Sequence, residues 1–395
     1  MRFPEFTDEW KESVLSDFVE RVKRKNKNNL CKLPLTISAQ YGLVDQISFF
    51  NKVIASENMS NYYLLHKGDF AYNKSYSSEY PWGAIKRLDC YEQGTLSSLY
   101  ICFKPYSHVS SDFLTHYFET SKWHQGISEI AVEGARNHGL LNVGIQDFFE
   151  TRHCLPQSLL EQEKIAKFLN LIEERIATQN KIIEKLESLI KGLNDSLYAQ
   201  YGNDVLTSFS SLGFSYSGLS GKSAQDFGSG KPFITYLNVY SNNIINEKDF
   251  QYVAIKDDEK QNVVEYGDVL FTLSSETPEE VGIGSVYLGN ENVYLNSFCF
   301  GIHIRNTKIA FPPYLSYYVS LTPFRKFIYP YAQGSTRFNL CKADFEKANI
   351  KLPSLENQKR IYSILSHIES KTETEKSLLD LYNSQKQHLL RQMFI

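Results

Sequence analysis

Long apolar runs, paired cysteines and a large excess of charge of one sign are all missing from this sequence of 395 residues. No stretch approaches the roughly 18 continuous apolar residues that a membrane-spanning helix needs, and the first residues lack the apolar core of a signal peptide. We therefore expect a cytoplasmic protein with no membrane partner. The 6 cysteines form no CxxC pair and are widely spaced, which favours reduced thiols and predicts neither disulfides nor a metal site.

Glycine and proline are also scarce, at 21 and 12 residues, whereas apolar residues make up 42% of the chain and charged residues 22%. This composition excludes collagen-like, disordered and low-complexity proteins. The length predicts two or three folded units. A formal net charge of −3 argues weakly against a nucleic-acid partner, although it averages over faces that can differ in sign.

The chain contains an internal repeat with a period of about 197 residues. Leu155-Pro156 and Leu352-Pro353 each precede a segment rich in Glu, Gln and Lys, in which apolar positions then alternate spacings of four and three. This pattern, sustained over about four heptads, is typical of a coiled coil. The positions predicted to pair the helices are Leu169, Ile172, Ile176, Ile183, Leu186, Ile190, Leu193, Leu365, Ile368, Leu379 and Leu389.

The second copy of the helix carries Thr372, Glu375 and Lys386 in its apolar stripe. Such residues would weaken a homodimer, but they are tolerable opposite the stronger first helix, which favours pairing within one chain. The alternative is two amphipathic helices, each packed on its own globular domain.

The segments before the helices repeat as well. Lys67-Gly68-Asp69-Phe70 matches Tyr266-Gly267-Asp268-Val269, and Gly134-Ala135-Arg136-Asn137 matches Gly334-Ser335-Thr336-Arg337. Period-two and helical stretches mix in both halves, which predicts an α+β fold. We expect two similar globular domains at 1–154 and 201–351, each followed by a long helix at 155–200 and 352–395.

These residues resemble the specificity (S) subunits of type I restriction-modification systems. The most specific segments are 334–345, which begins Gly-Ser-Thr-Arg-Phe-Asn-Leu, and the Leu-Pro-x-Leu-Glu opening of 352–361. The resemblance implies two target-recognition domains, each reading half of a bipartite sequence in double-stranded DNA. The long helices would pair as an antiparallel coiled coil with pseudo-twofold symmetry and dock DNA methyltransferase (modification) subunits, and through them the restriction and translocase subunits.

The candidate DNA contacts combine basic side chains for phosphates with amides and guanidinium groups for base edges. In the first domain they are Arg21, Lys23, Arg24, Lys25, Lys27, Tyr72, Asn73, Lys74, Lys86, Arg87, Arg136 and Asn137. In the second domain they are Lys222, Lys231, Thr272, Ser274, Ser275, Arg337 and Asn339. Each group has an alternative interpretation. The basic run near residue 21 could equally be a solvated face, and Tyr72 could be a core residue. Thr272, Ser274 and Ser275 could simply complete a turn.

Enzyme signatures are weak, so we expect a non-catalytic recognition subunit with no cofactor. Phe311-Pro312-Pro313-Tyr314 resembles the Asn-Pro-Pro-Tyr loop of amino-methyltransferases but lacks its amide, and Gly228-Ser229-Gly230-Lys231 lacks the rest of a phosphate-binding loop. Asp258-Glu259-Lys260 reads more simply as an exposed charged loop than as half of a nuclease motif. The alternatives are a coiled-coil protein-binding adaptor and, less favoured, a self-sufficient DNA methyltransferase or nuclease.

Overall fold

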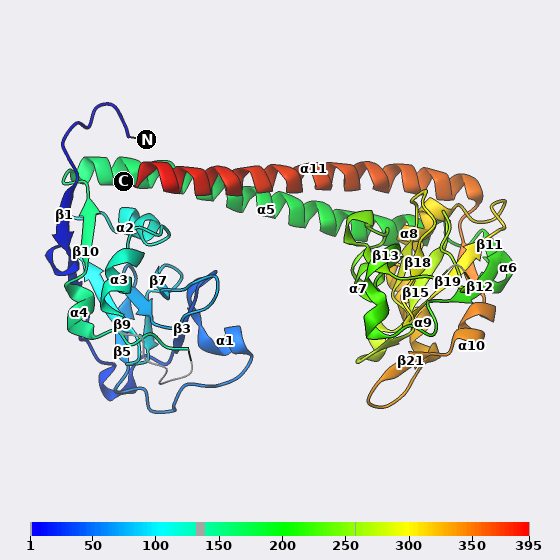
Figure 1. Cartoon of the computed structure of the whole chain (residues 1–395), viewed down its shortest axis with the longest axis horizontal. Helices are drawn as coiled ribbons and strands as arrows, with labels where there is room; N and C mark the ends of the chain where they lie inside the picture. The colour runs from blue at the N-terminus through cyan, green and yellow to red at the C-terminus, as the bar shows by residue number, and fades with distance from the viewer. Residues whose placement is uncertain (1, 132–138, 257, 395) are drawn as a thin grey trace. The chain divides into compact units, whose positions relative to one another are not determined.

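The computed structural model describes residues 2–131, 139–256 and 258–394 and divides into two compact units (Figure 1). The first unit comprises Met1–Asn180 with Leu378–Ile395, and the second comprises Lys181–Ser377. Each unit holds a globular part together with portions of two long helices, α5 (Leu159–Tyr201) and α11 (Leu355–Met393). The units therefore cut across the predicted helical segments, because each long helix contributes side chains to both cores.

The first unit is built on an antiparallel four-stranded sheet with the order β2-β9-β6-β7. Its strands are β2 (Val19–Arg21), β9 (Ile101–Pro105), β6 (Phe70–Asn73) and β7 (Ala84–Arg87). Three antiparallel pairs accompany it, namely β1 (Lys11–Val14) with β10 (Arg152–Leu155), β3 (Leu35–Ser38) with β4 (Gly42–Asp45), and β5 (Tyr63–His66) with β8 (Gln93–Leu96). The short helices are α1 (Gln46–Phe50), α2 (Ser111–Tyr117), α3 (His124–Ile130) and α4 (Ile145–Phe149).

The second unit contains a four-stranded antiparallel sheet with the order β12-β19-β15-β17. Its strands are β12 (Gly213–Ser217), β19 (Cys299–Ile304), β15 (Val269–Thr272) and β17 (Gly284–Val286). A two-stranded sheet pairs β11 (Val205–Thr207) with β22 (Ile350–Leu352). A three-stranded sheet has the order β14 (Gln251–Val253), β13 (Phe227–Ile234) and β18 (Tyr294–Leu295). A second three-stranded sheet has the order β16 (Ser274–Ser275), β21 (Phe338–Leu340) and β20 (Ala332–Gln333). The short helices are α6 (Phe209–Leu212), α7 (Tyr236–Ser241), α8 (Pro312–Tyr318), α9 (Thr322–Ile328) and α10 (Lys342–Lys347).

The Gly-Asp turns at the start of β6 and β15 make the same hydrogen bonds. Gly68 and Gly267 adopt φ of 89° and 88°, a region that favours glycine. Asp69 Oδ2 accepts the His66 N–H at 2.8 Å, and Asp268 Oδ2 accepts the Glu265 N–H at 2.8 Å. Burial raises the pKa of both carboxyls, and these backbone hydrogen bonds oppose the shift.

The starts of the two long helices are also built alike. Gln162 donates to the Pro156 carbonyl at 2.8 Å and accepts the Ser110 N–H at 2.8 Å. Gln358 donates to the Pro353 carbonyl at 2.9 Å and accepts the Phe311 N–H at 2.8 Å. Each buried glutamine thus ties its helix to the segment that starts a short helix of its own unit, α2 or α8. Leu155 and Leu352, where the helical segments were predicted to begin, still belong to strands β10 and β22.

The residues predicted to pair the helices face inward on both helices. Leu169, Ile183, Leu365 and Leu389 are buried, and the other predicted positions are partly buried. Polar contacts join α5 and α11 within each unit. In the first unit Lys386 Nζ lies 2.7 Å from Glu173 Oε1 and Arg175 Nε donates to Tyr382 Oη at 2.8 Å. In the second unit Lys376 Nζ lies 2.7 Å from Glu187 Oε1.

The last turns of α11 enter the core of the first unit. Leu389, Leu390, Met393 and Phe394 are buried there, together with residues of the four-stranded sheet. The Phe394 ring lies 5.3 Å from the ring of Phe113. The first core is therefore completed by side chains that lie far away in the sequence.

Candidate nucleic-acid interface

The basic run at the start of the first unit divides into side chains that have a partner among the described residues of the unit and side chains that have none. Arg24 forms an ion pair with the buried Asp69, so it holds the Gly-Asp turn. Lys25 Nζ lies 3.7 Å from the centroid of the Tyr63 ring and donates to the Asn61 carbonyl. Arg21 donates to the Tyr63 hydroxyl at 3.4 Å. Lys23 and Lys27 are exposed and make no ion pair within the described part of the chain, which leaves both charges available to a phosphate.

The structure corrects the prediction for Tyr72. Its side chain is fully buried, its ring stacks on Phe148 at 4.9 Å, and its hydroxyl donates to the Trp82 carbonyl. Tyr72 is therefore a core residue and has no surface to offer DNA. Its neighbours Asn73 and Lys74 lie at the end of β6 and are partly exposed.

Two further predicted cations of the first unit are held by carboxylates. Arg87 lies 2.7 Å from Asp89 and 2.6 Å from Asp112, measured between side-chain nitrogen and oxygen atoms. Lys86 forms an ion pair with Glu119. Both arginine contacts and the lysine contact reduce the charge available for a phosphate. Arg136 and Asn137 lie outside the residues that the structure describes.

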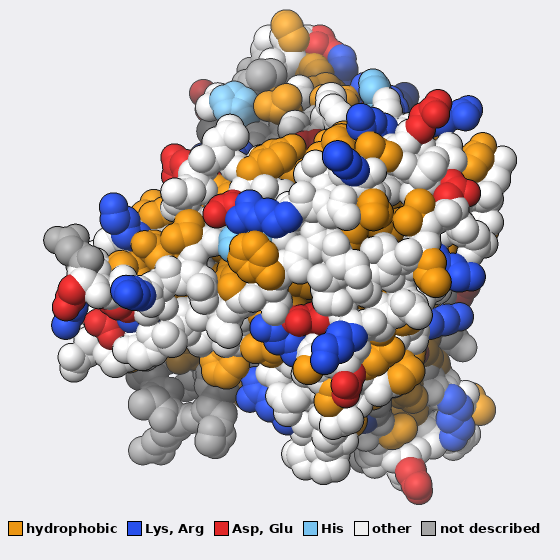
Figure 2. Space-filling model, turned by 90° about the vertical axis from the view of Figure 1, so that its right-hand side faces the viewer, with side chains coloured by type: hydrophobic (Ala, Val, Ile, Leu, Met, Phe, Trp, Pro, Cys, Tyr) orange, Lys and Arg blue, Asp and Glu red, His pale blue; other side chains and the backbone are white. Residues whose placement is uncertain are grey.

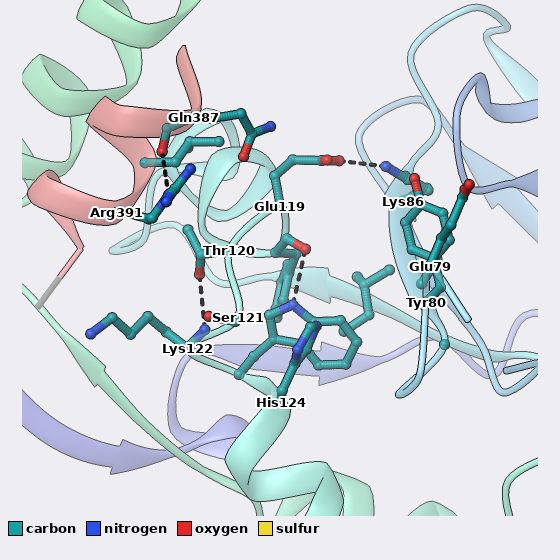
Figure 3. Close-up of a pocket in the computed structure, with 16 residues that line it drawn as sticks. Glu79, Tyr80, Lys86, Glu119, Thr120, Ser121, Lys122, His124, Gln387 and Arg391 are labelled. Carbon is teal, nitrogen blue, oxygen red and sulfur yellow. Dashed lines mark hydrogen bonds and ion pairs between the residues drawn. The ribbon is translucent and has the colours of Figure 1, made fainter. Parts of the chain in front are cut away.

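Lys86 lines a cavity of about 530 Å³ in the first unit (Figure 3). Lys122, His124 and Arg391 line the same cavity, and burial lowers the pKa of His124. Lys122 and Arg391 are exposed and make no ion pair among the residues with described positions. No local sequence pattern indicates this pair of cations, because Arg391 lies on α11, far from Lys122 along the chain, and only the fold brings it to the cavity.

Four of the predicted contacts in the second unit have structural roles instead. Thr272 is fully buried and its hydroxyl accepts the Ile283 N–H at 3.0 Å. Ser274 and Ser275 are buried in β16, and Ser275 donates to Glu280 at 3.0 Å. The Lys222 side chain is only 7% exposed and forms an ion pair with Glu259. The structure therefore corrects the prediction for these four residues, whose side chains are covered by the protein and are not exposed to DNA.

The remaining predicted contacts of the second unit are exposed. Lys231 lies on β13, and Asn339 lies on β21. Arg337 precedes β21, and its guanidinium carbon lies 5.8 Å from the centroid of the exposed Phe298 ring. Figure 2 shows one face of the structure, on which basic, acidic and hydrophobic side chains are interspersed. The described residues on this face therefore form no large patch of positive charge or of negative charge.

The segment that resembles a methyltransferase loop is the start of a helix. Phe311 is the N-cap residue of α8, and Pro312 and Pro313 occupy its first turn, where proline is well tolerated. Within the described ranges, no group of three His, Cys, Asp or Glu side chains is placed to hold a metal ion. No helix of the part described is both long and apolar enough to cross a bilayer.

Comparison with known proteins gives a family match in the second half of the chain and solved structures with the same fold. Residues 220–381 match the family model of the type I restriction modification DNA specificity domain. No curated protein matches the sequence. A solved chain described under "Structural basis underlying complex assembly and conformational transition of the type I R-M system" is 17% identical, with a TM-score of 0.60 and coverage of 98% of each chain.

A second solved structure, the type I restriction-modification system S subunit from M. genitalium, is 13% identical. Its TM-score is 0.52, and the alignment covers 100% of this chain and 99% of that one. Both structures share the fold along the full length of the chain. The resemblance noted in the sequence is thereby confirmed: residues 220–381 match the type I restriction modification DNA specificity domain, and the chain shares the fold of the solved type I restriction-modification S subunit.

Proposed function

We propose that this chain is the DNA sequence-specificity subunit of a type I restriction-modification complex and performs no chemistry itself. The observation that carries the proposal is the match of residues 220–381 to the DNA specificity domain. The first unit has a sheet of the same strand number and the same Gly-Asp turn, which supports a duplicated reader. Each globular part then reads one half of a bipartite target.

The two helices pair as an antiparallel coiled coil that sets the distance between the half-sites. The polar contacts within the units support this, because residue numbers rise along α5 from Glu173 to Arg175 while those of their partners fall from Lys386 to Tyr382. The 43 residues of α5, at about 1.5 Å of rise each, span about 64 Å. Duplex DNA advances about 3.4 Å per base pair, so half-sites more than one helical turn apart are within reach.

Phosphate contacts supply affinity and a few base contacts supply sequence choice. Among the described residues of the first unit, Lys23, Lys27 and Lys74 are predicted cations whose side chains have neither a hydrogen bond nor an ion pair, so they are the first choice for phosphate contacts. In the second unit, Lys231 serves phosphates, while Arg337 and Asn339 carry the guanidinium and amide groups that pair with guanine and adenine edges.

Modification subunits dock on the outer faces of the helices. Leucine side chains on these faces are left exposed, namely Leu160, Leu171 and Leu189 on α5 and Leu381 on α11, which are 50% to 70% accessible. The methyltransferase chemistry, and the restriction activity recruited through it, reside in these partners.

Salt-dependent binding to duplex DNA tests the proposal. If four phosphates are neutralised, affinity for a mixed-sequence duplex should fall about 100-fold between 50 and 200 mM salt, because counterions are released on binding. The Lys23→Gln, Lys27→Gln double variant should flatten the logarithmic salt dependence by about two units. Fluorescence anisotropy at several salt concentrations measures both effects. Absence of duplex binding, with retained binding of a helical protein partner, would favour the adaptor instead.

A further inference from the structure

Phe298 is an exposed aromatic side chain beside Arg337, one of the residues proposed to read bases in the second unit. It lies between β18 and β19, its side chain is 56% exposed, and the guanidinium group of Arg337 sits over its ring. A single exposed phenylalanine is unremarkable by itself. Its position next to Arg337 and its rigid support give it further significance.

The backbone holds both side chains in fixed places. The Phe298 N–H donates to Asn296 Oδ1 at 2.9 Å, and its carbonyl accepts the Leu273 N–H at 2.9 Å. On the other side, Gly334 adopts a φ of 142°, and a Cβ there would lie 2.1 Å from the Arg337 carbonyl oxygen. The turn that presents Arg337 is therefore tight, and the ring and the guanidinium group form one preorganised surface.

The second unit contains a similar pair that differs in one respect. Arg305 lies over the ring of Phe214 at 5.3 Å, and Phe214 is 55% exposed. The charge of Arg305 is compensated, since its Nη1 lies 2.9 Å from Glu265 Oε2. Arg337 makes no ion pair with any residue that the structure describes. Of the two pairs, only the one with Phe298 offers an uncompensated cation to a polyanion.

We propose that Phe298 is a specificity-determining residue that packs against the methyl group of a thymine in the second half-site. Arg337 pairs with the edge of a neighbouring base. This assignment rests on the proposed function. A phenylalanine ring has no hydrogen-bonding group, and the thymine methyl is the apolar feature that the major groove presents to such a ring. The contact leaves the Arg337 guanidinium group free to reach an acceptor on guanine.

Selection from a library of random-sequence duplexes tests the assignment. The full chain is compared with its Phe298→Ala, Phe298→Leu and Arg337→Ala variants, and Phe214→Ala serves as the matched control. We expect Phe298→Ala to lose a thymine preference at one position, next to the position that Arg337→Ala relaxes. Phe298→Leu should keep part of this preference, and Phe214→Ala should select the same sequences as the unaltered chain.

Replacing that thymine by uracil in the selected duplex gives a second measurement that needs no variant. Loss of one buried methyl group should weaken binding of the unaltered chain about four-fold and leave Phe298→Ala unaffected. Unchanged selection by a folded Phe298→Ala variant, or equal affinity of the unaltered chain for the two duplexes, overturns the assignment. If the unaltered chain binds no duplex at all, the proposed function itself fails.

Discussion

Phe394→Ala is expected to destabilise the first unit by about 3 to 5 kcal/mol, the usual cost of removing a buried aromatic side chain. Phe394 is 1% exposed and its ring contacts Trp10, Phe113 and Tyr117 at centroid distances of 5.3 to 6.4 Å. These partners belong to the globular part of the unit, and α2 contributes two of them. The truncation would leave a cavity between the C-terminal end of α11 and the globular part of the first unit.

Tryptophan fluorescence during urea unfolding measures this effect in the first unit alone. The 3 tryptophans of the chain, Trp10, Trp82 and Trp123, all belong to that unit. Leu381→Ala is the matched control, because Leu381 lies on the same helix and is 66% exposed. If Phe394→Ala unfolds at the same urea concentration as Leu381→Ala, then the end of α11 does not complete the first core.

Acid is expected to destabilise the first unit through His153. Burial lowers the pKa of His153 to about 4, and its ring nitrogens face the neutral hydroxyls of Tyr117 and Thr151 at 2.9 and 2.8 Å. Below pH 6.5, about the ordinary pKa of histidine, His153 is protonated in the unfolded chain but stays neutral in the folded unit until the pH approaches 4. Stability is therefore intact above about pH 6.5 and is lost as the pH falls toward 4. The loss at about pH 5 is about 2 kcal/mol.

The free energy of unfolding of His153→Gln, followed by the same tryptophan signal, isolates this contribution. The variant starts from a lower stability at neutral pH but should lose about 2 kcal/mol less on acidification to about pH 5. Substitution of the exposed His108 by Gln provides the control. Equal pH dependence of His153→Gln and the unaltered chain would exclude His153 as the source.

The long helices were predictable because their signal is local and repeats every seven residues. Leu169 and Ile183 on α5, and Leu365 and Leu389 on α11, are buried at positions that the spacing alone selects. The Gly-Asp turns were recognisable for a similar reason, since a glycine with positive φ followed by a buried carboxylate requires particular residues. Strand order was not predictable, because pairing between distant segments leaves no periodic pattern in either one.

The candidate contacts were less predictable, because exposure depends on what the rest of the chain covers. Tyr72 and Thr272 lie in short strands that are buried on both faces, and a four-residue strand does not show in its sequence whether the rest of the chain covers one face or two. Lys222 and Arg87 carry the expected charge, but carboxylates distant in sequence neutralise it. Phe298 was missed for the converse reason, since an isolated phenylalanine predicts a core residue until its surroundings are known.

The most direct test of a two-part DNA reader is a map of methylated adenines in the DNA of cells that carry or lack this chain. We expect the deletion to remove methylation from one split motif, with two specific halves separated by an unspecified gap. Restoring the chain with Arg337→Ala should bring back methylation with only one half relaxed. A methylation map that is identical with and without the chain would contradict its role as a specificity subunit.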